Sequence, residues 1–209
     1  IIITGGGLEN KGAQAMTFIT VNELAKRFPE HRIVVLSYQD MRRPASEREQ
    51  YRFEFADFQP IKFARAQKNP ILKLICCLRN AKQLAETEAL YRNSDLMVDI
   101  SGYALGSNWS YAVCNAFLEN IEYAKAFGIP VYLMPQSFGP FDFSGEHAAE
   151  LVRRIKKALE YAQKVCTREQ EGYDLVNRSY CLANTVLCGD LVLNNKGIDL
   201  CNVYRTLPE

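Results

Sequence analysis

Histidine is scarce in this chain, which contains only His31 and His147. Neither belongs to an H-E-x-x-H pattern, and the cysteines form no C-x-x-C pair, so the sequence has no zinc signature and no recognisable catalytic triad. His31 precedes a predicted strand, and His147 is expected to be exposed in the first turn of a helix. We therefore predict that the protein uses no metal ion and no cofactor.

Net charge is also nearly absent, because 25 Lys and Arg residues face 24 Asp and Glu residues, a formal charge of +1. Such a chain has no overall field to attract nucleic acid or an anionic membrane, so recognition of charge must be local. No apolar run approaches the roughly 20 residues that cross a bilayer, and the first run, Ile1–Thr4, lacks the flanks of a signal peptide. We predict no nucleic-acid partner, no transmembrane segment and a cytoplasmic location.

Disulfides are not expected either. The seven cysteines are odd in number and mostly lie in apolar runs, which is typical of reduced core thiols. With 209 residues, 48% of them hydrophobic, the chain can bury a full core. It starts without methionine and ends just past the strand-like run Leu191–Leu193, so we expect a piece of a longer polypeptide: a Rossmann-like domain at 1–190 and the start of a linker or second domain at 191–209.

Short β-branched or apolar runs alternate with stretches of helical period, the pattern of βα units around a parallel sheet. Apolar residues recur on one side of the stretches 16–28, 113–124 and 151–162, and the basic run 153–157 in the last is expected to be a solvated face. The predicted fold class is α/β, a Rossmann-like parallel sheet with helices on both faces. The predicted strands are Ile1–Thr4, Ile33–Ser37, Arg52–Phe55 (the weakest), Leu96–Ile100, Val131–Met134, Lys164–Thr167 and Thr185–Cys188.

Two glycine-bearing loops follow predicted strands, at the sheet edge where α/β proteins bind ligands. Residues 5–13 open the first long helix and can offer backbone N–H groups to an anion or sugar, or form a plain tight turn. Their spacing matches neither a Walker A loop nor G-x-G-x-x-G. Residues 99–109 hold an acid that can orient or deprotonate a hydroxyl, or cap a turn. The candidates are Gly6, Gly7, Asn10, Lys11 and Gly12 in the first loop, and Asp99, Ser101, Gly102 and Trp109, the only tryptophan, in the second.

The third loop, residues 135–141, follows the strand predicted at Val131–Met134. Gln136 and Ser137 offer neutral hydrogen bonds there, and the Gly139–Pro140 pair forces a turn that would hold them in place. A binding loop and a purely structural turn are both open interpretations.

The fourth loop contains the strongest anion-binding candidate. Thr167 and Gln170 have capping-box spacing, which places Arg168 at the first helical position, where its fork of donors can hold a phosphate or carboxylate. The alternative is a surface arginine paired with Glu169 or Glu171.

In order and spacing these loops resemble the polysaccharide pyruvyl transferase family. The resemblance implies a GT-B-like fold of two Rossmann-like domains, and transfer of pyruvate from phosphoenolpyruvate onto sugar hydroxyls as a ketal, in the biosynthesis of exopolysaccharide or other cell-surface glycans. It also implies that Arg168 contacts the donor and that Asn10 and Gly12 line the cleft. The segments that carry it are Gly5–Gly12, Asp99–Gly102, Pro135–Phe141 and Thr167–Glu169.

The chain departs from the family pattern in two ways. Many members have an aspartate where Ala13 stands, and Gln14 cannot replace its charge. Members are also half as long again or more, and their second domain adds basic and acidic groups, so we expect this chain to be incomplete as a catalyst.

Other interpretations stay open. A GT-B-type glycosyltransferase would bind a nucleotide sugar, and a non-catalytic sugar-binding or assembly module would tolerate loss of Arg168. Separately, the apolar run 71–78 has basic flanks, so it can rest on the inner face of a membrane that carries lipid-linked acceptors, or form a buried core helix. Its flanking residues are Arg65, Lys68, Arg79 and Lys82.

Overall fold

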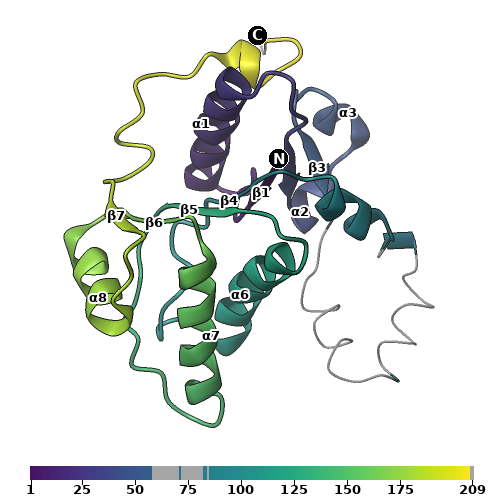
Figure 1. Cartoon of the computed structure of the whole chain (residues 1–209). Helices are drawn as coiled ribbons and strands as arrows, with labels where there is room; N and C mark the ends of the chain where they lie inside the picture. Colours follow the sequence, from purple (N-terminus) through teal and green to yellow (C-terminus); the bar gives the residue numbers. More distant parts are fainter. Residues whose placement is uncertain (58–70, 72–81, 84, 208–209) are drawn as a thin grey trace.

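A seven-stranded, all-parallel sheet forms the centre of the protein in a computed structural model that describes residues 1–57, 71, 82–83 and 85–207 (Figure 1). The strand order β3-β2-β1-β4-β5-β6-β7 reverses direction between β1 and β4. That order confirms the predicted Rossmann-like α/β class. The strands are β1 (Ile2–Thr4), β2 (Val34–Leu36), β3 (Glu54–Ala56), β4 (Met97–Asp99), β5 (Val131–Gln136), β6 (Lys164–Thr167) and β7 (Thr185–Leu187).

Helices lie on both sides of this sheet, with α1 on one side and α6, α7 and α8 on the other (Figure 1). Helices α6 and α7 each bury a mainly apolar stripe, as their sequence period predicts. The buried residues of α1 are half polar: Thr17, Thr20 and Asn22 lie among Ile19, Val21 and Leu24. The sheet therefore separates two hydrophobic clusters, one packed under α1 and one under α6 and α7. The helical elements are α1 (Lys11–Arg27), α2 (Tyr38–Met41), α3 (Ala45–Arg48), α6 (Tyr111–Ala126), α7 (Ala148–Tyr161), α8 (Gln170–Tyr180) and the 3-10 turn η1 (Leu200–Asn202).

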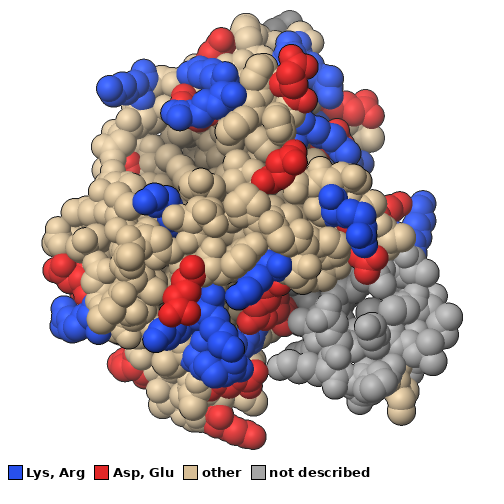
Figure 2. Space-filling view, in the orientation of Figure 1, with Lys and Arg blue, Asp and Glu red and all other residues tan. Residues whose placement is uncertain are grey.

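One part of the sheet is less covered than the rest. β1 and β4 are buried along their whole length, as expected for central parallel strands. In β5, by contrast, Val131 and Leu133 are buried while Tyr132 is 38% exposed on the α1 side. An apolar hollow of about 610 Å³ lies there, between α1, β4, β5 and Leu191. Most of its lining residues are uncharged, with Glu23, Arg27 and Asp95 as the charged ones, and Figure 2 shows a largely uncharged surface over the middle of this face.

Two predicted details of the fold are wrong. Leu191–Leu193 is a turn and not a strand, because the Asp190 carboxylate accepts hydrogen bonds from the amides of Val192 and Leu193 at 2.8 and 3.0 Å. Arg154, in the basic run of α7, is buried and donates two hydrogen bonds to Glu122 of α6 at 2.7 and 2.8 Å. The rest of that run is exposed, namely Arg153, Lys156 and Lys157.

The cysteines also differ from expectation. Among the described residues all cysteines are free thiols, but only Cys114 is buried, while Cys181, Cys188 and Cys201 are exposed. Cys181 directly follows α8, Cys188 directly follows the edge strand β7, and Cys201 lies in η1. Apolar neighbours in the sequence therefore do not bury these three thiols.

The C-terminal residues return to the body of the domain. Asn22 of α1 accepts hydrogen bonds from the Asp199 amide and the Asn202 side chain, and Val203 is fully buried. The proposed division at residue 190 stays a prediction. Within the described part of the chain, no helix combines the length and the apolar character needed to cross a membrane. Residues 72–78 of the apolar, basic-flanked segment lie outside the described residues.

Candidate functional site

Four loops meet at one edge of the sheet. They follow β1, β4, β5 and β6, which are consecutive neighbours and all run in the same direction. Their carboxyl ends therefore lie side by side, at the strand-order reversal where open α/β sheets bind ligands. Neighbouring strands are about 4.8 Å apart, so the tip of β6 lies roughly 14 Å from the tip of β1. The structure brings the glycine loop and Arg168 to the same edge, but at opposite ends of it.

The first two loops are packed against each other. Gly5 has φ +71°, and a Cβ on it would lie 2.2 Å from the Ser101 hydroxyl oxygen. A Cβ on Gly6 would lie 2.8 Å from Thr17 Oγ1 and 2.9 Å from Ile100 Cδ1. Glycine is required at both positions to let the backbone pass close to its neighbours.

The backbone donors of the glycine loop point inward. The Gly7 amide donates to Thr17 Oγ1 and the Leu8 amide donates to Asp40 Oδ2, each at 3.0 Å. These two N–H groups are therefore not offered to a ligand. Sequence reasoning anticipated donors in this loop but could not show that side chains of the same chain would take them.

The solvent-facing part of this loop is Asn10, Lys11 and Gly12, all of them exposed. The Asn10 carboxamide oxygen caps α1 by accepting from the Ala13 amide at 2.8 Å, and Lys11 Nζ contacts Gln14 Oε1 at 3.2 Å. The capping bond fixes where α1 begins, and it leaves the ammonium group of Lys11 at the surface.

Asp40 is the residue that holds this loop, and sequence analysis missed it. Its carboxylate is fully buried and accepts hydrogen bonds from Ser37 Oγ and Arg43 Nε, both at 2.7 Å, besides the one from Leu8. The bond to Asp40 raises the pKa of Arg43. The available signal was the Ser37-x-x-Asp40 spacing directly after a strand, because Ser37 caps the short helix α2.

Asp99, a candidate for catalysis, is buried at the four-loop edge and accepts hydrogen bonds from several of its residues. It is 2% exposed and accepts hydrogen bonds from Thr4 Oγ1 at 2.8 Å and from the amide and hydroxyl of Ser101, both at 3.0 Å. Burial raises its pKa above the usual value, and these hydrogen bonds oppose that rise. Gln136 Nε2 completes the shell at 3.4 Å and is itself fully buried. Asp99 thus links the ends of β1, β4 and β5.

The third loop is tied to the second by backbone bonds. The Ser137 amide donates to Gly102 O at 2.8 Å, and the Gly139 amide donates to Leu105 O at 2.9 Å. The Tyr103 hydroxyl donates to Gly139 O at 2.7 Å, and the Gly139–Pro140 peptide bond is cis. Gly102 and Gly139 are buried, so their place in the site is to shape the loops, and the half-buried Ser137 is the side chain that faces the fourth loop.

Arg168 lies at the tip of β6 and not in a helix. The predicted capping box is wrong, because Thr167 still pairs in the sheet with Gln136 and Leu187, and α8 begins only at Gln170. The Arg168 guanidinium is 38% exposed, with Nε 3.2 Å from Glu169 and Nη1 3.8 Å from Asp190. Ser137 Oγ donates to the same Glu169 oxygen at 3.1 Å. The arginine is therefore positioned by two carboxylates, one of which is the Glu169 partner anticipated from the sequence.

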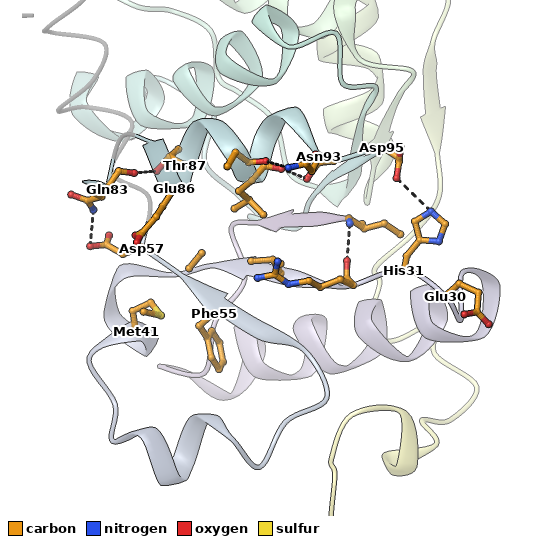
Figure 3. A pocket seen from close by; sticks show the side chains of 17 residues that line it. Glu30, His31, Met41, Phe55, Asp57, Gln83, Glu86, Thr87, Asn93 and Asp95 are labelled. Carbon is orange, nitrogen blue, oxygen red and sulfur yellow. Dashed lines mark hydrogen bonds and ion pairs between the residues drawn. The ribbon is translucent and has the colours of Figure 1, made fainter. Parts of the chain in front are cut away.

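A large cavity elsewhere in the described part of the chain is a different feature. It has a volume of about 830 Å³ and lies against β2 and β3, with Phe55 and Met41 on one side and Gln83, Thr87 and Asn93 on the other (Figure 3). Its polar side chains pair with each other, as in the His31–Asp95 contact at 3.6 Å and the Gln83–Asp57 bond at 3.1 Å. Nor does any group of three or more His, Cys, Asp or Glu side chains in the described ranges form a metal site. We therefore place the candidate site at the four-loop edge.

Comparison with known proteins agrees with that placement. No curated protein matches the chain. The family model of polysaccharide pyruvyl transferases matches residues 10–208, which includes all of the second, third and fourth loops. The match covers nearly the whole chain, so the protein is a transferase of polysaccharide biosynthesis, with a small-molecule donor and a glycan acceptor. The chain belongs to the polysaccharide pyruvyl transferase family.

Proposed function

We propose that the protein transfers the pyruvyl group of phosphoenolpyruvate to two hydroxyls of a sugar, forming a cyclic ketal. The observation that carries the proposal is the half-exposed guanidinium of Arg168 at the tip of β6, within the segment that resembles the family. Phosphoenolpyruvate bears a phosphate and a carboxylate, and the planar fork of an arginine suits either group.

The chemistry needs charge stabilisation and proton transfer but no redox step. A proton adds to the methylene carbon of the enol, and C2 becomes electrophilic. One sugar hydroxyl attacks C2, inorganic phosphate leaves, and the second hydroxyl closes the ketal while both hydroxyl protons are released. Arg168 acts by holding the anionic donor and balancing the charge on the leaving phosphate.

The distance between the tips of β1 and β6 gives the two ends of the four-loop edge different roles. A donor as small as phosphoenolpyruvate cannot reach across roughly 14 Å from Arg168 to the glycine loop. We therefore place the donor at the β5–β6 end, beside Ser137 and Arg168, and let Asn10, Lys11 and Gly12 line the far end of the cleft. We place the reaction in the cytoplasm, with lipid-linked glycans at the inner membrane face as the acceptors.

The test is release of inorganic phosphate from phosphoenolpyruvate by the full-length protein with a panel of sugar acceptors. Arg168→Ala should lower kcat/KM about 100-fold, because a forked, charge-assisted contact contributes roughly 3 kcal/mol. Arg168→Lys should restore only part of it, since lysine has no fork. Arg178, exposed near the end of α8, provides the matched control, and Arg178→Ala should leave turnover unchanged.

Two results would favour the other functions. Thermal stabilisation by a nucleoside diphosphate, without any by phosphoenolpyruvate, indicates a nucleotide-sugar glycosyltransferase. Full activity of Arg168→Ala in glycan binding, with no phosphate release by the wild type, indicates a non-catalytic sugar-binding module.

A further inference from the structure

Exposed aromatic rings stand beside the donor end of the edge. Trp109 is 42% exposed and Tyr111 is 37% exposed, and only Ser110 separates them in the chain. Each packs against a second ring: Trp109 lies 5.5 Å from Tyr103, and Tyr111 lies 4.8 Å from His147, between ring centroids. We call these four residues the aromatic step. Large rings left half in solvent at a ligand-binding edge are typical of binding surfaces.

The aromatic step is held rigidly by its surroundings. The Tyr103 hydroxyl is fixed by its 2.7 Å bond to Gly139 O, and the Trp109 amide donates to Gly106 O at 3.1 Å. Between these residues the Ser107 amide donates to Pro140 O at 2.7 Å. A ligand that stacks on Trp109 would therefore meet a surface already in place, which lowers the entropy cost of binding.

Hydrogen-bonding groups surround the rings. Ser107 Oγ contacts the Asp142 carboxylate, and Asn108 and Ser110 are exposed. Ser110 precedes α6, yet its hydroxyl does not cap that helix. Flat rings bordered by hydroxyl, amide and carboxylate groups match a pyranose, whose C–H face is apolar and whose rim carries hydroxyls.

A chain of hydrogen bonds through the third loop connects the aromatic step to the donor end of the edge. Tyr103 bonds to Gly139 of the third loop, and Ser137 of that loop bonds to Glu169, which holds Arg168. We propose that the aromatic step, with Trp109 and Tyr111 as its stacking residues, binds a pyranose ring of the acceptor glycan. The proposal rests on the proposed function, because it assigns a position to the acceptor of that reaction.

Trp109 is the only tryptophan in the chain, so it reports on its own surroundings. Methyl glycosides of galactose, glucose and mannose are the probes. At least one of them should change Trp109 fluorescence in the wild type, and Tyr111→Ala should weaken that titration several-fold. Tyr132 is equally exposed but lies on the α1 side of β5, so Tyr132→Ala is the matched control and should leave the titration unchanged.

Kinetics give the second measurement. Trp109→Ala should raise the acceptor KM about tenfold and leave the phosphoenolpyruvate KM within about twofold, and Trp109→Phe should recover most of the loss because it keeps a ring. The thermal melting of each variant shows that it is folded.

The outcomes separate the two proposals. A glycoside response at Trp109 without any phosphate release supports the aromatic step and overturns the pyruvyl transfer. Phosphate release with no glycoside response at Trp109, an unchanged acceptor KM in Trp109→Ala, or an equal effect of Tyr132→Ala overturns the aromatic step. A response to uridine or adenosine monophosphate in place of glycosides also overturns it, because the rings would then stack on a base.

Discussion

Removing the Asp40 carboxylate should destabilise the protein far more than removing a neighbouring one. Asp40 and Glu47 both pair with Arg43, at 2.7 and 3.3 Å, but Asp40 is fully buried whereas the Glu47 side chain is 49% exposed. Asp40 also accepts hydrogen bonds from the Leu8 amide and from Ser37 Oγ. Asp40→Ala thus leaves the part-buried Leu8 amide without its acceptor. Glu47→Ala removes only an exposed partner of Arg43, and water can replace it.

The magnitude follows from these partners. Loss of the acceptor for the Leu8 amide costs about 1.5–2 kcal/mol, the bond from Arg43 costs about 1 kcal/mol because that side chain can rehydrate, and the bond from Ser37 costs about 0.5 kcal/mol. The free energy of unfolding should fall by about 3 kcal/mol in Asp40→Ala, or roughly 6–12 °C in melting temperature for a chain of this size. Glu47→Ala should cost less than about 0.5 kcal/mol.

Urea denaturation of both variants measures this difference. Asp40→Asn should lie between them, since its amide oxygen still accepts from Leu8 but no longer carries the charge that pairs with Arg43. Hydrogen exchange gives a local readout, because the Leu8 amide should exchange faster in Asp40→Ala. Equal stability of Asp40→Ala and Glu47→Ala, with unchanged exchange at Leu8, would refute the role of Asp40 in holding the glycine loop.

Three further changes test the framework around the site. Arg154→Ala should lower the free energy of unfolding by about 1–2 kcal/mol in urea denaturation, because it removes a buried guanidinium that bonds to the half-exposed Glu122 of α6, whereas exposed Arg153→Ala should cost less than about 0.5 kcal/mol. Gly5→Ala should cost about 2 kcal/mol or more in thermal unfolding, since its Cβ meets Ser101; a neutral result would contradict the packing of the first two loops. The raised pKa of Asp99 means that the folded state binds its proton more tightly, so the stability of the wild type relative to Asp99→Asn should fall as pH rises above about 3.8, and a parallel pH profile would argue against burial of the charge.

The strands and their order along the chain could be predicted because each signal is local. A buried parallel strand is a short apolar run, and every predicted strand has its counterpart in the sheet, with ends shifted by at most two residues. The position of the four loops at one edge follows from the parallel topology alone. The run Leu191–Leu193, which only looked strand-like, forms a turn because the carboxylate of Asp190 just before it accepts two backbone amides.

Contacts between distant residues could not be predicted. Asp40 accepts a hydrogen bond from the amide of Leu8, which lies 32 residues away in the sequence, and Arg154 donates to Glu122, also 32 residues away. The period of α7 places Arg154 beside the apolar stripe of this helix. That the Glu122 carboxylate lies next to it follows only from the packing of α6 against α7. The predicted capping box at Thr167 is wrong for a related reason. Thr167 pairs with both neighbouring strands, which keeps it in the sheet despite its local capping spacing.

The inward bonds of the glycine loop change where charge can be recognised at this edge. If the Gly7 and Leu8 amides were free, the loop before α1 would offer an anion two more backbone donors beside the amino end of that helix. They are taken by Thr17 and Asp40, and Asp40 adds a buried negative charge directly behind the loop. Two of the donors that an anion could use at the β1 end are thus already taken, which supports the proposed placement of the anionic donor beside Arg168 at the β6 end. In the proposed arrangement a neutral, hydroxyl-rich acceptor does not need those two amides, so it would extend from the aromatic step along the second loop toward Asn10 and Gly12.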